Sequence, residues 1–381
     1  MTTSAPAPAP VRADETATHR EILQQPDSWQ RLVASLDDRR AELDAFLQPL
    51  LADPELRIVL TGAGTSAFVG DIASVDLRRH LGRRVESIAT TDVVADPHGS
   101  LGAPGRVLLV SFARSGNSPE SVAATRVVDD VAPGTHHLVV TCDPAGALAR
   151  EHRGKEGSFV LEMPSETNDT GFAMTSSFST MLLAVLLAFR PELVAGTGAL
   201  VAAARTIAGL EARIASLAEG TERVVYLGSG ALQGLARESA LKLLELTAGG
   251  VVSFFDTPLG FRHGPKAVAG AHTLVVVYGS ADPYTARYDA DILRELRADG
   301  AVRVVSVGGD ADDERSFPLD DLAGLDDALR SVALVGFAQL LALATSVAHG
   351  CTPDNPFPGG TVNRVVQGVT IHDHREGAAR P

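Results

Sequence analysis

The chain has 381 residues, of which 45% are hydrophobic and 21% charged, a composition typical of a globular protein of two domains rather than of a disordered chain. Its formal net charge of −14 argues against binding to nucleic acid or to an anionic membrane, and it means that an anionic ligand needs a local positive site. Two cysteines, Cys142 and Cys351, are too few for a disulfide framework, and the N-terminus lacks the apolar segment of a signal peptide, so we expect a cytoplasmic protein.

The first fifty residues predict a short tail followed by helices. An Ala-Pro repeat at residues 5–10 is typical of an extended, disordered segment. From residue 13 to residue 52 apolar side chains recur at helical spacing, beginning with Trp29, Leu32 and Val33. We therefore assign residues 1–50 to a disordered tail and a helical extension.

Short apolar runs of strand type alternate with helical patterns along the rest of the chain. In the first half these runs cover residues 57–61, 84–90, 106–111 and 137–141, and in the second half residues 223–227, 251–255, 273–278 and 302–307. Such alternation predicts an α/β fold, in which parallel sheets carry helices on both faces.

The two halves repeat one unit. The segments IVLTGAG (58–64) and VVYLGSG (224–230) share a strand, a Gly-x-Gly turn and a following helix, at an offset of 166 residues. We predict two tandem doubly wound domains, at residues 51–200 and 201–350, with residues 351–381 forming a tail over the active site. The apolar segment 332–348 is better explained as a buried core helix than as a membrane span, and the alternation in residues 365–372 suggests a docked strand.

A polar turn after the third strand resembles a phosphate cradle. Ser115, Gly116, Asn117 and Ser118 put several N–H and O–H donors before a helix, and Arg114 adds a guanidinium. Donors at a helix N-terminus favour an anion, above all a phosphate. The alternative is an ordinary N-cap with a tight turn, because serine caps helices routinely.

A second turn, at residues 62–66, holds Gly64, Thr65 and Ser66. It lacks the third glycine of a dinucleotide-binding fingerprint, so it does not favour a nicotinamide cofactor. Thr65 and Ser66 could contact a sugar hydroxyl, and a purely structural turn is the alternative.

An ionic stripe marks the helix predicted at residues 231–248. Glu238, Lys242 and Glu245 share one side of a helix that is otherwise apolar, so the stripe should line a cleft. Lysine is rare here, with three residues against thirty arginines, and two of the three lie at Lys242 and Lys266. With His263 in the following loop, these groups suit general acid–base catalysis on a small anionic substrate. A solvated ion ladder is the alternative.

Taken together, the segments GAGTS (62–66), SFARSGNSPES (111–121), TNDTGFAMTSSFSTMLL (167–183), ESALKLLEL (238–246) and FRHGP (261–265) resemble the double-SIS (sugar isomerase) domain family. The resemblance covers residues 50 to 375. It is closest to the galactosamine-6-phosphate deaminase/isomerase branch, also called tagatose-6-phosphate ketose/aldose isomerase. It implies two tandem SIS domains and a homodimer or higher homo-oligomer.

The resemblance also implies roles for individual residues. Glu245 would move the proton between C1 and C2 of the sugar, next to Lys242, and His263 would open the ring, often from across a dimer. The phosphate would bind at Arg114–Ser118, where Ala113 replaces one hydroxyl of the related synthases. The rest of the implied substrate site consists of Gly64, Thr65, Ser66, Thr175, Ser176 and Gln367. Gln367 stands where the synthases carry a lysine, and an amide cannot form a Schiff base.

The hypothesis from the sequence is therefore a cytoplasmic hexosamine-6-phosphate deaminase/isomerase that converts galactosamine 6-phosphate to tagatose 6-phosphate and ammonia. It needs no cofactor, and we expect no metal, because His136-His137 and His372-x-His374 lack metal-ligand spacing. A deglycase or an aldose/ketose isomerase acting on another sugar phosphate is one alternative. A non-catalytic SIS module that senses sugar phosphates is another.

Overall fold

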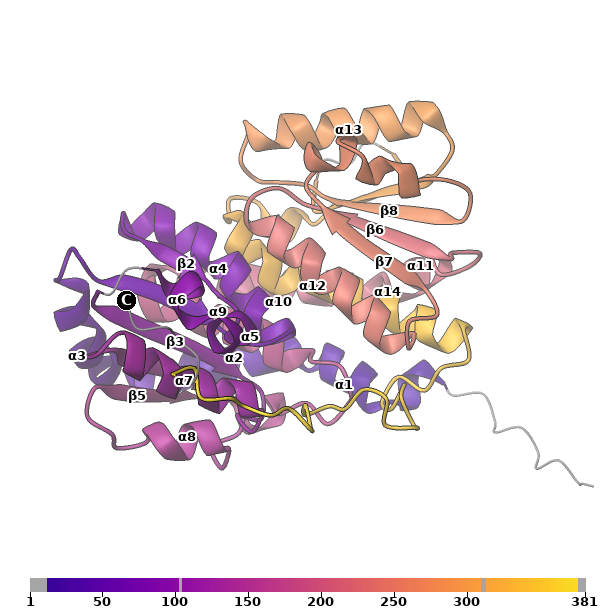
Figure 1. The fold of residues 1–381 in the computed structure, drawn as a ribbon. Helices are drawn as coiled ribbons and strands as arrows, with labels where there is room; N and C mark the ends of the chain where they lie inside the picture. The colour runs from indigo at the N-terminus through magenta and orange to yellow at the C-terminus, as the bar shows by residue number, and fades with distance from the viewer. Residues whose placement is uncertain (1–11, 103–104, 310–312, 376–381) are drawn as a thin grey trace, which may run out of the picture.

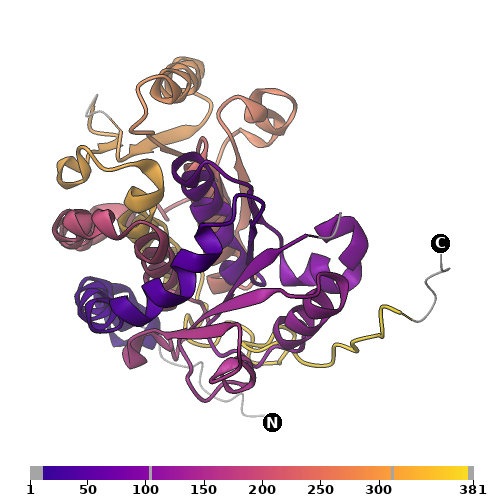
Figure 2. The same cartoon turned by 90° about the vertical axis from the view of Figure 1, so that its left-hand side faces the viewer.

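Two parallel five-stranded sheets organise the computed structural model, which describes residues 12–102, 105–309 and 313–375 (Figures 1 and 2). The first sheet has the order β2-β1-β3-β4-β5, with β1 at Arg57–Thr61, β2 at Val85–Ser87, β3 at Val107–Ala113, β4 at His136–Thr141 and β5 at Ser158–Glu162. The second has the order β10-β9-β8-β6-β7, with β6 at Arg223–Leu227, β7 at Val252–Asp256, β8 at Thr273–Tyr278, β9 at Arg303–Val307 and β10 at Ser316–Phe317. The predicted α/β class with two doubly wound sheets is confirmed.

The internal repeat is visible in the register of the sheets. In the first sheet Arg57 of β1 pairs with Val107 of β3, and in the second sheet Arg223 of β6 pairs with Thr273 of β8. Each residue of the second pair lies 166 positions after its counterpart in the first pair (223 − 57 and 273 − 107). The turns repeat as well. Gly64 and Gly230 precede their helices with φ of 55° and 58°, a left-handed conformation that favours glycine.

Four helices pack between the two sheets and fill the main hydrophobic core. They are α4 at Thr65–Leu81, α9 at Ser176–Phe189, α12 at Ala231–Leu246 and α14 at Asp327–Ala348, and α12 touches both α4 and α14. The outer faces are covered by α5 at Thr90–Ala95, α6 at Pro97–Leu101, α7 at Pro119–Val131, α8 at Ala147–His152 and α13 at Thr285–Asp299. The ionic stripe of α12 therefore lies deep in the molecule, at the junction of the two halves.

The apolar segment near the C-terminus belongs to α14. Among the described residues α14 is the one helix long and apolar enough to cross a membrane, and 83% of its most apolar window is buried inside the protein. This confirms the prediction of a buried core helix.

The N-terminal extension consists of α1 at Ala17–Leu23, α2 at Gln25–Asp38 and α3 at Arg40–Leu51. These helices join both halves: α2 packs on α9 and on α10 (Thr197–Gly209), while α1 packs on α14. Between α10 and β6 lies α11 at Glu211–Ser216. The first eleven residues, predicted as a disordered tail, lie outside the described residues, and the predicted domain boundaries stay a prediction.

The C-terminal tail follows α14 and, drawn in yellow in Figure 1, passes α1 towards α7. Its start is fixed by Asp354, whose carboxylate accepts hydrogen bonds from the backbone N–H groups of Ala17 and Thr18, each at 2.8 Å. The strand predicted at residues 365–372 is wrong, because these residues have no strand pairing. Their apolar side chains, Val366, Val369 and Ile371 among them, are exposed instead.

Two buried histidines of the first half, one on β4 and one on α8, lie next to each other. His137 and His152 are 1% and 2% exposed, and their rings are 4.5 Å apart. His137 contacts Asp129 at 2.7 Å, and His152 contacts the Ser158 hydroxyl at 3.0 Å. Burial, helped by the charge of His137, lowers the pKa of His152 to about 4.

The histidine pair predicts acid sensitivity. In the unfolded chain His152 takes up a proton near pH 6.5, whereas in the folded protein it does so only near pH 4. The free energy of unfolding should therefore fall as the pH drops from about 6.5 to about 4. The contribution of His152 should be on the order of 1–3 kcal/mol. In the variant His152→Asn this acid-induced loss of stability should be smaller. Melting temperatures measured between about pH 6.5 and about pH 4 would show the difference. The matched control is His349→Asn at an exposed histidine. An equal loss of stability in acid for the unaltered protein and both variants would contradict the role of His152.

Candidate active site

A cavity of about 230 Å³ lies at the carboxyl ends of β1 and β3. The strand order reverses between these two strands, and such switch points are where open α/β sheets bind ligands. The floor of the cavity comes from the loops after β1 and β3. Its walls come from Phe172 and Met174 before α9, from Glu245 on α12, and from Val362, Asn363, Arg364 and Val366 of the tail.

The predicted cradle lines this cavity with Arg114, Ser115, Gly116 and Ser118. Ser118 is the N-cap residue of α7, yet its side chain makes no capping hydrogen bond. Its hydroxyl is thus free for a ligand, which favours the phosphate interpretation over simple capping. Asn117, by contrast, accepts a hydrogen bond from the Ala147 N–H and does not line the cavity.

The turn after β1 contributes Gly64, Thr65 and Ser66 to the same cavity. These residues open α4, whose N-terminus makes no side-chain cap. The N-termini of α4 and α7 therefore both meet the cavity, and the partial positive charge of each helix end favours an anion there.

Arg114 is buried without a carboxylate as a hydrogen-bond partner. Its guanidinium donates to the carbonyl oxygens of Phe172 at 3.1 Å and Arg364 at 2.9 Å, and the residue is 7% exposed. Burial, together with the nearby charge of Arg364, lowers the pKa of Arg114. Asp169 and Glu245 lie near enough to favour its charge, but among the described residues no carboxylate binds the guanidinium directly, so an anionic ligand could do so.

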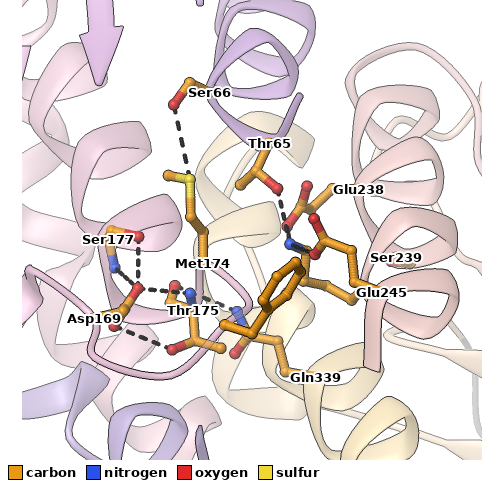
Figure 3. A network of polar contacts seen from close by, with 12 residues as sticks. Thr65, Ser66, Asp169, Met174, Thr175, Ser177, Glu238, Ser239, Glu245 and Gln339 are labelled. Carbon is orange, nitrogen blue, oxygen red and sulfur yellow. Dashed lines mark hydrogen bonds and ion pairs between the residues drawn. The ribbon is translucent and has the colours of Figure 1, made fainter. Parts of the chain in front are cut away.

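The ionic stripe of α12 forms a buried network beside the cavity, seen in Figure 3 with Thr65, Glu238 and Glu245 converging. The Lys242 ammonium is completely buried and donates to Thr65 Oγ1 at 2.8 Å and to Glu245 Oε2 at 2.5 Å. Burial opposes its charge, but the carboxyl groups of Glu238 and Glu245 outweigh that effect and raise the pKa of Lys242. The prediction of a cleft-lining stripe is confirmed for Glu245, which reaches the cavity.

Glu238 lies behind this network and is fully buried. Lys242 Nζ is 3.5 Å from Glu238 Oε1, and neither carboxyl oxygen has a hydrogen-bond partner among the described residues. Burial raises the pKa of Glu238 to about 8, although Lys242 opposes this.

His263 lies away from the cavity of its own chain. It follows the short helix Gly260–Arg262, is exposed, and is absent from the cavity lining. Its neighbours Arg262 and Lys266 both bind Glu295, at 2.8 Å and 2.6 Å, which fixes this loop on α13. The structure thus brings Glu245 and the cradle together but not His263.

Thr175 and Ser176 are also outside the cavity, because their side chains are fully buried behind its wall. They bind Asp169, whose carboxylate accepts hydrogen bonds from the backbone N–H and hydroxyl groups of Thr175, Ser176 and Ser177. Asp169 was missed by sequence reasoning, although the hydroxyl-rich run after it is a signal of helix capping. Gln367 is exposed and does not line the cavity either.

The equivalent position in the second half is a cavity of about 380 Å³, whose charged lining consists of Asp76, Asp282, Asp326, Asp327 and Arg79. The loop after β8 is held by Asp327, which accepts from the Ser280 hydroxyl at 2.5 Å and the Ala281 N–H at 2.7 Å. Asp289 accepts from the Ser280 N–H and the Ser229 hydroxyl, each at 2.9 Å. Carboxylates therefore line the cavity of the second half and bind its donor groups, and their negative charge disfavours an anionic ligand there.

Among the described residues, no group of three or more His, Cys, Asp or Glu side chains could hold a metal ion. The expectation of a reaction without metal or cofactor stays a prediction.

Comparison with known proteins identifies the family. The SIS domain model matches residues 50–190. A Streptomyces coelicolor protein, provisionally named D-galactosamine-6-phosphate deaminase AgaS, is 51% identical over 97% of this chain and 99% of its own. The D-galactosamine-6-phosphate deaminase AgaS of Escherichia coli is 46% identical over 94% of this chain and 96% of its own.

Solved structures agree with this assignment. The crystal structure of tagatose-6-phosphate ketose/aldose isomerase from Escherichia coli matches with a TM-score of 0.88 and 41% identity, covering 96% of this chain and 99% of that one. Glucosamine-6-phosphate deaminase from Thermotoga maritima, at 21% identity and a TM-score of 0.67, shares the fold over 92% of this chain and 99% of its own. The chain belongs to the SIS-domain family, in the branch that contains the AgaS proteins.

Proposed function

We propose that the protein is an isomerising deaminase that converts galactosamine 6-phosphate and water to tagatose 6-phosphate and ammonia. The observation that carries the proposal is one cavity shared by the Arg114–Ser118 cradle and the Glu245 carboxylate. A sugar phosphate that docks at the cradle would present its carbon chain to Glu245. The names of the AgaS relatives support the aminosugar as substrate.

The reaction follows from these groups. After ring opening, Glu245 takes the proton from C2 and an enolamine forms. Glu245 returns the proton to C1, which gives a ketimine at C2. Water then adds to the ketimine carbon, the C–N bond breaks, and ammonia leaves. The ion pair with Lys242 at 2.5 Å holds the Glu245 carboxylate in place for both transfers.

The second candidate is an aldose/ketose isomerase, the activity for which the Escherichia coli protein of similar structure is named. It uses the same proton transfer between C1 and C2 and differs only in the group at C2. An assay panel separates the two candidates. Ammonia released from galactosamine 6-phosphate supports the deaminase, whereas aldose–ketose interconversion of amine-free sugar phosphates without ammonia release supports the isomerase.

We also propose a cytoplasmic homodimer. The strand β7 is an edge of the second sheet, and the region from the end of α12 to the loop after β7 exposes Leu244, Val252, Phe254, Phe255 and Leu259, each at 38% or more. Such an apolar edge suits a second copy of the chain. The exposed His263 follows this edge directly, so the partner could receive it at its own cavity.

The first test concerns the proton carrier. Glu245→Gln keeps the shape of the side chain but removes the base, so turnover should fall by roughly 10²–10⁴ while a sugar phosphate still binds. Ammonia release and ligand titration measure the two effects. Glu55→Gln, at an exposed position, is the control. Near-normal turnover in Glu245→Gln would remove this residue from the mechanism.

The second test concerns the cradle. Ser115→Ala combined with Ser118→Ala should weaken binding of sugar phosphates, by about 1.5–3 kcal/mol for each lost hydrogen bond to the charged group. The melting temperature should change little, because Ser118 makes no capping hydrogen bond and Ser115 Oγ accepts only one exposed hydrogen bond, from the Asn117 N–H at 3.3 Å. Inorganic phosphate should compete with the substrate in the unaltered enzyme, and a failure to compete would speak against the cradle.

The third test concerns the dimer. Glu245→Gln and His263→Ala should each be inactive alone. If His263 acts on the partner's cavity, co-expression should restore activity, because one of the two sites in each mixed dimer has both groups intact. No recovery in mixed dimers that are shown to form would mean that each site is built within one chain.

A further inference from the structure

The cavity is a positive site in an acidic protein. The chain carries a net charge of −14, yet the charged residues in the cavity lining are Arg114, Arg364 and Glu245. Arg114 comes from the cradle, whereas Arg364 comes from the C-terminal tail, 250 residues further on. The tail therefore brings a second guanidinium to the place where the phosphate is expected.

Arg364 is exposed, and its side chain has no partner among the residues that the structure describes. Among the described residues its guanidinium makes no hydrogen bond and no ion pair, while the other described arginine of the tail, Arg375, binds Asp373 at 2.9 Å. An arginine that lines a cavity and lacks a counter-charge is available to an anion in that cavity.

The backbone around Arg364 is held against the cradle. Its carbonyl oxygen accepts the hydrogen bond from Arg114 at 2.9 Å, and the ring of Phe357 packs on Phe172 with centroids 5.2 Å apart. The tail thus crosses the cavity between the Asp354 contact to α1 and the Arg114 contact to the cradle. The charge of the nearby Arg364 disfavours that of Arg114, an effect that an anion between the two guanidinium groups would offset.

We propose that Arg364 is a phosphate-binding residue, and that the phosphate of the substrate draws the tail over the cavity through it. A phosphate dianion between Arg114 and Arg364 would be matched by two positive charges, and guanidinium groups suit phosphate oxygens in geometry as well as charge. The inference rests on the proposed function only in requiring a substrate that carries a phosphate.

The tail becomes a part of the binding site in this arrangement. It would discriminate phosphorylated from free sugars, since a neutral sugar offers nothing to Arg364. The competing occupant of Arg364 is a carboxylate of a second copy of the chain, and in that case phosphate affinity would not depend on this residue.

Calorimetry with two non-reacting probes tests the inference: inorganic phosphate and glucitol 6-phosphate, which has no carbonyl group and so can neither isomerise nor release ammonia. Arg364→Gln should weaken both roughly ten- to hundredfold, the effect of losing one charge-assisted hydrogen bond. Arg364→Lys should recover part of the loss, because it restores the charge without the planar fork. The matched control is Arg375→Gln, in the same tail but away from the cavity, which should bind as the unaltered protein does. Unchanged phosphate affinity in Arg364→Gln would overturn the inference.

A second measurement needs no variant. Trypsin should cut the full-length protein after Arg364, and saturating inorganic phosphate should slow that cut by tenfold or more, if phosphate holds this side chain. Equal cleavage rates with and without phosphate would count against the inference. The two proposals can fail separately. If no hexosamine 6-phosphate releases ammonia but Arg364→Gln still loses phosphate affinity, the deaminase is wrong and the role of Arg364 stands.

Discussion

The candidate active site depends on one buried ammonium. Lys242 has no access to water and reaches across the junction of the two halves, from α12 of the second to Thr65 of the first. A buried cation is costly unless nearby groups compensate for its lost hydration, and here Glu245 and the Thr65 hydroxyl do so. Because these contacts must form together, the turn after β1 and the carboxylate at the cavity are placed relative to one another by the same side chain.

The walls of the cavity are fixed by a second polar centre. Asp169 collects the N–H and hydroxyl groups at the start of α9, all of them buried. It thereby satisfies helix-end donors that have no partner within the helix. Phe172 and Met174 lie between Asp169 and α9 along the chain, so the same capping interaction places these two wall residues. Rigid supports of this kind are what a proton-transferring carboxylate requires.

Much of the fold and part of the candidate site could be predicted from local sequence. Short stretches of sequence were enough to predict the strands, the repeat at an offset of 166 residues and the ionic stripe of α12. Each of them shows as a regular spacing of residue types. Thr175, Ser176 and Gln367 were placed in the substrate site by resemblance, but the first two are buried on Asp169 and the third is exposed away from the cavity. Asp169 and Arg364 were missed because their importance lies in contacts that only the folded chain creates. The segment 365–372, which was predicted as a strand, shows the same limit, because alternation of apolar and polar residues does not supply a neighbouring strand to pair with.

The carboxylates that close the loop after β8 show how two copies of one unit diverge. In the second half Asp327 and Asp289 accept hydrogen bonds from the loop after β8, and the cavity there is lined mainly by carboxylates, which disfavour an anionic ligand. Among the described residues no carboxylate binds the turn Arg114–Ser118 of the first half, so this turn stays available to an anionic ligand. One copy of the duplicated unit therefore offers a positively charged cavity and the other an acidic one, and Glu245 of the second copy lines the cavity of the first, so the candidate site needs both copies.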